Sequence, residues 1–415
     1  MYKGTWDQPA LVAIWNNLKS IPKDSSLSAI FSGVLIVFIS TTGPIAILFQ
    51  AAAAGNLPAN ILNSWLFCVF LGSALFGIYL TLRTGQPIIG SWASTTTAIL
   101  IMILPNHSIN EVVGGYLLAS IGLILLAYGK LFDRIMELIP KPVVMGMMAG
   151  VLITFTSKMF LSLEFDTLMG ILMIFVYVIA RWRNLAAPTF YALLVGGAIA
   201  TFKGKLKLSK LNLQVVHPFY IKPIFTIASL LTIALPIIVI VITTQNIPGL
   251  TLLKNAGCEV KTKLIVGLGG FLSLLMAPFG GAGINISAMT AAIALDKSAH
   301  EKLERRYIAG IATGIAYIFA AIFASFFTNI FTLFPVALNA VLAGLALYPV
   351  LMTSLRGIAL DKLQLAGPIA FLVTISNTRI FGLGAACWGL FAGVLADRIE
   401  SRQIKLHEKN SSEGS

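Results

Sequence analysis

The sequence predicts an all-α polytopic membrane protein with 14 transmembrane segments, arranged as two inverted repeats of seven segments. Three observations lead to this fold class. Hydrophobic residues make up 57% of the 415 residues and charged residues only 11%, whereas a soluble domain carries about 25% charge. Long apolar runs alternate with loops that hold most Lys and Arg residues. Two apolar runs, at matching places in the two halves, are interrupted by Pro, Gly, Ser and Thr.

The basic residues follow the pattern expected for a membrane protein. The net charge is +13, but Lys and Arg are concentrated in loops between apolar runs. If both termini are cytoplasmic, most of these loops lie on the inner side, as the positive-inside rule requires. The Lys-rich linker at 204–221 is the main exception. The charge therefore predicts membrane orientation, and we expect no nucleic-acid partner.

The first 25 residues are expected to form a cytoplasmic tail. Leu11, Ile14, Trp15 and Leu18 share one face of a helix over residues 8–19. This pattern predicts an amphipathic helix at the membrane surface, and a disordered tail is the alternative. The mixed Lys and Asp residues of this stretch are not typical of a cleavable signal peptide.

The chain divides into a first repeat at 26–203, the linker at 204–221, a second repeat at 222–398 and a cytoplasmic tail at 399–415. The segments of the first repeat are expected at 27–52, 59–82, 87–103, 110–129, 140–160, 165–181 and 187–203. Those of the second are expected at 223–245, 261–277, 279–295, 305–331, 335–355, 365–380 and 381–397. Because each repeat has an odd number of segments, the second copy must enter the membrane from the opposite side.

Collinear sequence matches support the repeat. The matched groups are Thr41, Thr42 and Gly55 with Thr243, Thr244 and Gly257; Pro87 with Pro278; Tyr116 with Tyr307; Pro142, Ala149 and Gly150 with Pro335, Ala343 and Gly344; and Tyr191, Leu193 and Gly196 with Trp388, Leu390 and Gly393. Single matches of this kind are common in apolar sequence. Their shared order along the whole chain is what predicts the repeat.

The two interrupted stretches, residues 86–97 and 277–288, are the candidate site. Pro87 and Pro278 each remove a backbone donor, and Ser or Thr residues follow before an apolar run. This pattern predicts segments 3 and 10 as a short extended stretch followed by a half-helix. If the two half-helices meet in the membrane, their N-termini present free N–H groups to a bound anion. No Lys or Arg lies in either stretch.

Polar and aromatic side chains of these stretches and of the first segment of each half are the candidate substrate-binding residues. They are Thr42, Gln50, Ser91, Trp92, Ser94, Thr95, Gln245, Phe279, Gly281, Asn285 and Ser287. The alternative is that the hydroxyls and amides only cap broken helices. For Trp92, an aromatic substrate pocket and ordinary helix packing are both open.

No Asp, Glu or His lies within the segments nearest this site, so proton coupling either uses the carboxyl of the substrate or is absent. The three cysteines, Cys68, Cys258 and Cys387, have no metal-ligand spacing and are expected to be small buried side chains. No catalytic motif, metal site or cofactor site is predicted. The sequence therefore favours a transporter over a membrane-embedded enzyme or a channel.

The chain resembles the bacterial benzoate/H+ symporter family over about residues 27–398. The motifs that carry the resemblance are Phe49-Gln50-Ala51-Ala52, Gln245-Asn246-Ile247-Pro248-Gly249, Ala277-Pro278-Phe279-Gly280-Gly281 with Ile284-Asn285, Arg305-Arg306-Tyr307, Ala343-Gly344-Leu345-Ala346-Leu347 and Trp388-Gly389-Leu390-Phe391-Ala392-Gly393. This family is similar in fold to the uracil-permease and sulfate-permease groups.

The resemblance implies a core domain (26–130 and 222–331) and a gate domain (131–203 and 332–398). It also implies substrate between segments 3 and 10, elevator-type alternating access and a homodimer formed through the gate domain. The expected function is secondary active transport of a small organic anion across the bacterial inner membrane. Benzoate or a related aromatic carboxylate is favoured, with H+ as the coupling ion. An inorganic anion or a nucleobase is the alternative substrate.

Two departures from the family pattern lie in the candidate site. After Ala277-Pro278-Phe279-Gly280-Gly281 the family usually has His and then Ala-Ile-Asn, whereas here Ala282 and Gly283 precede Ile284-Asn285, so the ionisable candidate is missing. The stretch from Ser91 to Thr96 keeps Trp92 but lacks the usual Pro-Gly. A nucleobase is disfavoured because the site lacks the carboxylate pair of the uracil-permease group.

Overall fold

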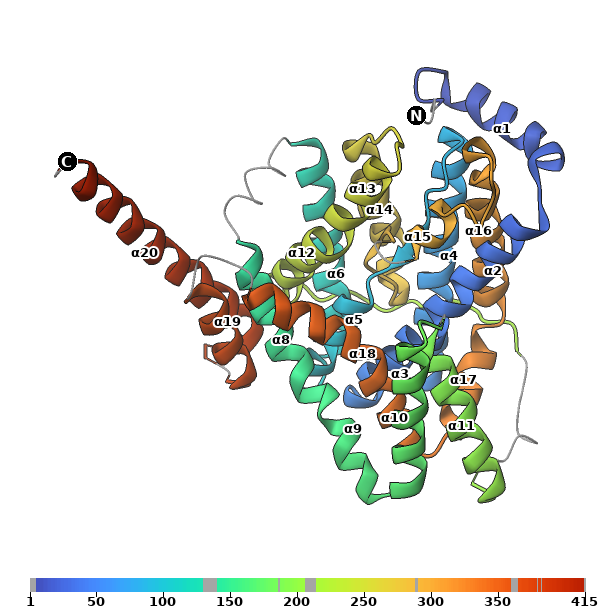
Figure 1. The fold of residues 1–415 in the computed structure, drawn as a ribbon. Coiled ribbons are helices and arrows are strands. Elements are labelled where there is room, and N and C mark those ends of the chain that lie inside the picture. The colour runs from blue at the N-terminus through green and yellow to red at the C-terminus, as the bar shows by residue number, and fades with distance from the viewer. Residues whose placement is uncertain are drawn as a thin grey trace.

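The computed structural model describes residues 5–129, 140–185, 187–205, 214–287, 290–359, 365–378, 380–381 and 383–413. The loop after the predicted fourth segment, much of the predicted linker and the end of the stretch 277–288 therefore lie outside the described residues. The fold is nearly all helical (Figure 1).

The helices of the first half follow the predicted segments closely. They are α1 (Ala10–Asp24), α2 (Leu27–Thr42), α3 (Pro44–Ala54), α4 (Ala59–Thr84), α5 (Ser94–Ile103), α6 (Ile109–Tyr128), α8 (Lys141–Thr156), α9 (Lys158–Leu161), the short η1 (Ser162–Glu164), α10 (Thr167–Trp182) and α11 (Pro188–Phe202). The predicted first segment is thus two helices that meet at Gly43, because Pro44 has no N–H to continue the α2 ladder.

The second half has the same general pattern. Its elements are η3 (Ser229–Ala234), α12 (Leu235–Ile240), η4 (Val241–Asn246), α13 (Ile247–Asn255), α14 (Thr262–Met276), η5 (Ala277–Phe279), α15 (Ala291–Leu295), η6 (Leu303–Arg305), α16 (Tyr307–Ile322), α17 (Ala324–Leu333), α18 (Val336–Ala359), α19 (Ala366–Ile375) and α20 (Ala385–Glu413). Two boundaries differ from prediction. The eighth segment continues to Asn255, and α20 continues into the predicted tail and projects from the other helices (Figure 1).

Seven helices among the described residues are long and apolar enough to cross a membrane, or eight when α16 and α17 count as one bent span. These two helices meet at an angle of 62°. Several predicted segments are shorter apolar helices, namely α5, α10, α11 and α19. Large apolar side chains such as Phe31, Leu125, Phe175 and Leu372 are exposed on the helix surfaces, as expected where lipid replaces water as the solvent.

The eighth segment contains two π-helical turns, η3 and η4, on either side of α12. A π-turn holds one residue more than an α-helical turn and is often found at functional sites. Pro236 and Pro248 lie just after the two π-turns, at the starts of α12 and α13. A proline cannot donate the α-helical hydrogen bond, which is consistent with a change of helix type at these places.

The two interrupted stretches pair with each other. Strand β1 (Gly90–Trp92) and strand β2 (Ile284–Ile286) form an antiparallel two-stranded sheet. Both stretches therefore have the predicted extended part followed by a helix, α5 and α15. The prediction of an all-α fold missed this small sheet. The pairing of β1 with β2 satisfies the backbone N–H and C=O groups that a break in a helix leaves unpaired inside the membrane.

The helices pack in two groups. In the first, α4 packs on α16 and α1, α16 also packs on α2, and α14 packs on α6. In the second, α8 packs on α18 and α19, α19 on α20, and α10 on α11. Contacts of α3 and α5 with α18 and α8 join the groups. The strand pair lies within the first group, between α4 and α14.

Helix α1 is longer than the predicted 8–19 helix. Its side chains Leu11, Trp15 and Leu18 are exposed, as predicted for a helix at the membrane surface. Its other side is attached to the helices: Asn17 Nδ2 donates to the Leu82 carbonyl at 2.8 Å, and Asp24 pairs with Arg305 at 3.0 Å.

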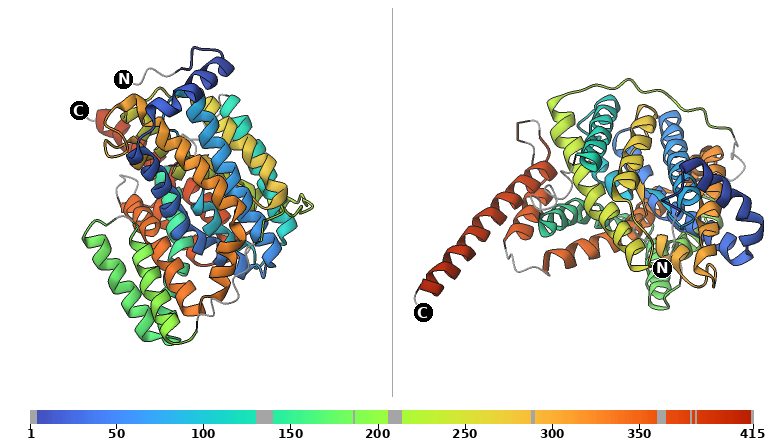
Figure 2. Two further views of the ribbon diagram at one scale, coloured as in Figure 1. Left: turned by 90° about the vertical axis from the view of Figure 1, so that its right-hand side faces the viewer. Right: turned by 90° about the horizontal axis from the view of Figure 1, so that it is seen from above.

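The described part of the linker, residues 214–226, is extended and runs along one side of the helices (Figure 2). The Ile221 N–H donates to the Pro278 carbonyl at 2.7 Å. The Ser64 hydroxyl accepts from the Phe219 N–H at 2.8 Å. These bonds attach the linker to α4 and to the loop before β2.

Candidate functional site

The strand pair fixes the geometry of the candidate site. Ser91 lies opposite Asn285, with Gly90 opposite Ile286 and Trp92 opposite Ile284. Two further backbone bonds extend the pairing: Ala93 N–H to the Gly283 carbonyl at 2.9 Å, and Ser287 N–H to the Ile89 carbonyl at 2.9 Å. Residues predicted from two distant stretches are thus brought together in register.

Gly283 shapes the turn that leads into β2. Its φ is +71°, in the left-handed region that L side chains rarely adopt. In this conformation its carbonyl accepts both the Ala93 N–H and, at 2.5 Å, the side-chain amide of Asn285. A glycine at this position therefore allows the tight turn into β2.

Helix α5 begins at the strand pair and offers free backbone donors there. The N–H groups of Thr96 and Thr97 donate to the Ala93 carbonyl. Those of Ser94 and Thr95 have no acceptor among the residues that the structure describes. With the helix dipole, these two groups can bind an anion.

The sequence predicted that the half-helices of segments 3 and 10 both present free N–H groups to an anion. The second half-helix differs from this prediction. Helix α15 has only five residues, Ala291–Leu295. The Ser287 hydroxyl accepts from the Thr290 N–H at 3.2 Å and bonds to the Thr290 hydroxyl at 2.6 Å. Ser287 therefore acts as a cap in this structure, and the free donors come from α5.

Thr95 contacts the eighth segment. Its hydroxyl lies 3.1 Å from that of Thr244 in η4. The next residue, Gln245, is half-buried, as are Ser91, Ser94 and Thr244. The polar side chains of the strand pair, α5 and η4 thus retain some accessible surface.

The remaining predicted residues lie elsewhere or are fully packed. The Phe279 ring lies 6.1 Å from that of Tyr220 in the linker, and Gly281 lies against Cys68 of α4. The Thr42 hydroxyl donates to the Phe38 carbonyl of its own helix at 2.6 Å.

The last two predicted substrate-binding residues are Trp92 and Gln50. Trp92 is 4% exposed and belongs to the main hydrophobic core, which fits the packing alternative. Gln50 is half-buried in α3, outside the strand pair. The three cysteines are buried and free, as predicted.

Several polar atoms near the strand pair are buried without a hydrogen-bond partner. They are Asn285 Oδ1, both polar atoms of the Gln86 side chain and Tyr317 Oη. Buried polar groups are normally paired, so each needs an explanation. Tyr317 was not predicted as a site residue, because a tyrosine in a long apolar segment gives no signal of its own.

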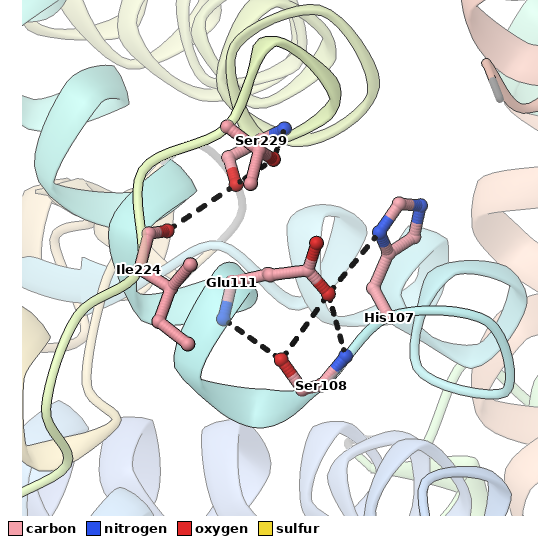
Figure 3. Close-up of polar contacts among 6 residues, drawn as sticks. His107, Ser108, Glu111, Ile224 and Ser229 are labelled. Carbon is pink, nitrogen blue, oxygen red and sulfur yellow. Dashed lines mark hydrogen bonds and ion pairs between the residues drawn. The ribbon is translucent and has the colours of Figure 1, made fainter.

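A second polar cluster lies at the other end of α5. His107 Nδ1 is 3.7 Å from Glu111 Oε2, and the Ser108 N–H donates to the same carboxylate at 3.0 Å (Figure 3). The His107 side chain is 5% exposed. His107 lies in the loop between α5 and α6, as the sequence predicted, and its side chain is buried next to the half-buried Glu111.

A cavity of about 30 Å³ adjoins this pair. It lies between the end of α5 and the start of α20, and its polar lining residues are Asn106, His107, Thr232 and Asn377. Such a volume holds one or two water molecules. The Thr232 hydroxyl is buried without a partner, so a water here would satisfy it.

A third charged cluster joins α10 and α11 outside the spans. Asp166 accepts from Lys203 Nζ at 2.6 Å and from Lys205 Nζ at 3.1 Å. The hydrogen bond from Lys203 is the main cause that lowers the pKa of Asp166 to about 2. Within the described residues, no three His, Cys, Asp or Glu side chains gather in a way that would hold a metal ion.

The fold and this site define a multi-pass membrane transporter. Residues 23–399 match the model of the BenE family, described as benzoate membrane transport protein. The chain therefore belongs to the benzoate membrane transport protein family, and it is not an enzyme.

Two curated relatives are similar to this chain over most of its length. The chain is 36% identical over 381 residues to the benzoate membrane transport protein of Acinetobacter baylyi, covering 91% of this chain and 96% of the relative. It is 30% identical over 377 residues to the inner membrane protein YdcO of Escherichia coli, covering 91% and 95%.

Solved structures share the fold. The transmembrane domain of the cyanobacterial bicarbonate transporter BicA matches with a TM-score of 0.57 and 15% identity, covering 89% of this chain and 96% of that domain. Murine Slc26a9, an anion transporter in the inward-facing state, matches with a TM-score of 0.61 and 13% identity, covering 92% of this chain and 70% of that one.

Proposed function

We propose that the protein is a secondary active transporter of benzoate or a related aromatic carboxylate in the bacterial inner membrane. The observation that carries this proposal is the family match together with the free N–H groups of Ser94 and Thr95. They can bind a carboxylate in a region of the sequence without Lys or Arg. The YdcO relative, named as an inner membrane protein, supports the location.

The proposed architecture is 14 segments in two inverted repeats, with both termini in the cytoplasm. The antiparallel pairing of β1 with β2 supports the opposite entry of segments 3 and 10. We assign the helix group that holds the strand pair to the core domain and the group around α8 and α18 to the gate domain. The core then moves against the gate by an elevator mechanism, and the gate also forms a homodimer.

We propose H+ as the coupling ion. His107 and Glu111 support this proposal because the buried His107 lies 3.7 Å from the half-buried Glu111 and lines a cavity between α5 and α20. Helix α5 then links this pair, at its C-terminal end, to the substrate at its N-terminus.

Ligand binding to the purified protein tests the substrate. Benzoate should raise the melting temperature in a concentration-dependent manner, whereas acetate, uracil and sulfate should have little effect. Asn285→Ala should weaken binding of benzoate in a variant that still folds. If no carboxylate stabilises the wild type, the proposed substrate is wrong. Uptake into proteoliposomes with and without an imposed proton gradient then tests the coupling ion.

A further inference from the structure

Tyr317 is a buried tyrosine whose hydroxyl has no partner. Its side chain is 0% exposed in α16, and its ring stacks on Phe70 of α4 with centroids 5.9 Å apart. The ring is therefore well packed, but Oη makes no hydrogen bond among the described residues. Leaving a buried hydroxyl unpaired is costly, so each one needs an explanation.

The hydroxyl of Tyr317 lies close to the strand pair. It lies beside the hydroxyls of Ser40 in α2 and Ser91 in β1. Ser91 is opposite Asn285 in the sheet, and α5 begins three residues later. The Ser91 hydroxyl also makes a long contact of 3.4 Å to the Trp92 carbonyl. Three hydroxyls from three different elements thus lie close together, and one of them belongs to the strand that leads into α5.

We propose that Tyr317 donates its O–H to the carboxylate of the bound substrate and so selects an anionic ligand. This inference rests on the proposed function, since it assigns a recognition residue to the same site. A phenol O–H is a strong donor that carries no charge of its own, and its hydrogen bond to an ionised oxygen is stronger than one between neutral groups. Tyr317 and the α5 N–H groups would approach the carboxylate from two directions.

The chemistry of the site limits the ligand class. The phenol O–H and the α5 N–H groups are donors, and a carboxylate offers two oxygens with several acceptor positions. A neutral amide such as benzamide has one acceptor oxygen and an NH₂ group that would face donors. The site therefore favours benzoate over benzamide, although the two molecules have the same shape.

Tyr317→Phe tests the proposal because it removes only the hydroxyl. We expect benzoate to bind about 10- to 100-fold more weakly, the effect of losing one hydrogen bond to a charged group. The melting temperature of the ligand-free variant should be equal to or above that of the wild type, since an unpaired buried group is lost. A hydroxyl with a merely structural role would give the reverse: lower stability and unchanged affinity.

Tyr177→Phe is the matched control. Tyr177 is also buried, and its hydroxyl is likewise without a well-formed hydrogen bond within the part of the chain that the structure describes, but it lies in α10 away from the strand pair. This variant should bind benzoate as the wild type does. Affinity should be measured by isothermal titration with both benzoate and benzamide, and Tyr317→Phe should reduce the preference for benzoate.

The outcomes separate this inference from the proposed function. If the wild type binds benzoate and Tyr317→Phe binds it equally well, the role of Tyr317 is wrong and the function stands. If the wild type binds bicarbonate or sulfate instead and Tyr317→Phe weakens that binding, the substrate is wrong and the role of Tyr317 stands. If the wild type binds none of these anions, both are wrong.

Discussion

Gly90 is the residue at which the site is most sensitive to a small change. A Cβ atom at this position would lie 2.1 Å from the Ser73 carbonyl oxygen and 2.9 Å from the Gly77 nitrogen. Both are backbone atoms of α4, so neither can rotate away. The close approach of β1 to α4 therefore requires glycine at this position.

We predict that Gly90→Ala separates β1 from α4 and lowers the free energy of unfolding by about 3 kcal/mol or more. Gly197→Ala is the control, because a Cβ there meets nothing within 4 Å. Gly197→Ala should leave the free energy of unfolding unchanged or raise it by about 0.5–1 kcal/mol, because alanine suits a helix interior better than glycine. Thermal unfolding of the two purified variants measures these changes in stability. Equal stability of Gly90→Ala and Gly197→Ala would contradict the prediction.

At the residue scale, the sequence predicted which stretches meet but not every side chain that faces the meeting point. Ser91 and Asn285 could be predicted because each follows a break signalled by Pro and Gly. Phe279 and Gly281 have similar signals, but Gly280 turns the chain with φ +89° before the strand begins. Tyr317 could not be predicted, since its position depends on how α16 packs against α2 and α4.

At the element scale, Asp166 connects two helices that are joined by few other polar contacts. Its carboxylate caps α10 by accepting from the Met169 N–H at 3.3 Å. It also binds Lys203 and Lys205, which follow α11. One side chain therefore fixes the N-terminus of one helix against the C-terminus of the next.

We predict that Asp166→Asn lowers the free energy of unfolding at pH 7 by about 1–2 kcal/mol. The pKa of Asp166 is lowered to about 2 in the folded protein, against about 3.9 in an unfolded chain. Its stabilising effect is therefore complete above about pH 4–5 and is lost as the pH falls toward 2. The difference in melting temperature between wild type and variant should shrink over that range. Glu164→Gln, at an exposed neighbour, is the control.

The elements themselves could be predicted well where apolar length and breaks decide them. The helix pair α2–α3 and both interrupted stretches fall where the sequence placed them. The π-turns η3 and η4 could not be predicted, because a π-turn leaves no pattern distinct from that of an α-helix. Gln245 stays a predicted site residue, and the contact of its neighbour Thr244 with Thr95 depends on η4 and could not be predicted.

At the scale of the whole molecule, the two helix groups touch at small residues. A Cβ atom at Gly43, between α2 and α3, would lie 3.3 Å from that of Ala346 in α18. This separation is close to that of a disulfide-bonded cysteine pair. The elevator proposal requires these two positions to move apart during transport.

We predict that Gly43→Cys with Ala346→Cys, in a variant whose three native cysteines are replaced, loses benzoate uptake on oxidation and regains it on reduction. Binding of benzoate should persist in the oxidised protein, because the strand pair is not cross-linked. The single-cysteine variants should transport under both conditions. Full uptake by the oxidised double variant would show that movement at this contact is not needed.

The strand pair also has a consequence for the synthesis of the protein. Because β1 and β2 come from opposite halves of the chain, the ribosome completes β1 long before its partner exists. Until then the edge of β1 has unpaired N–H and C=O groups inside the membrane, and neither lipid nor α4 alone can satisfy them. The first half is therefore an incomplete folding unit, and it must be held in the insertion machinery, or shielded by water or a chaperone, until the second half arrives.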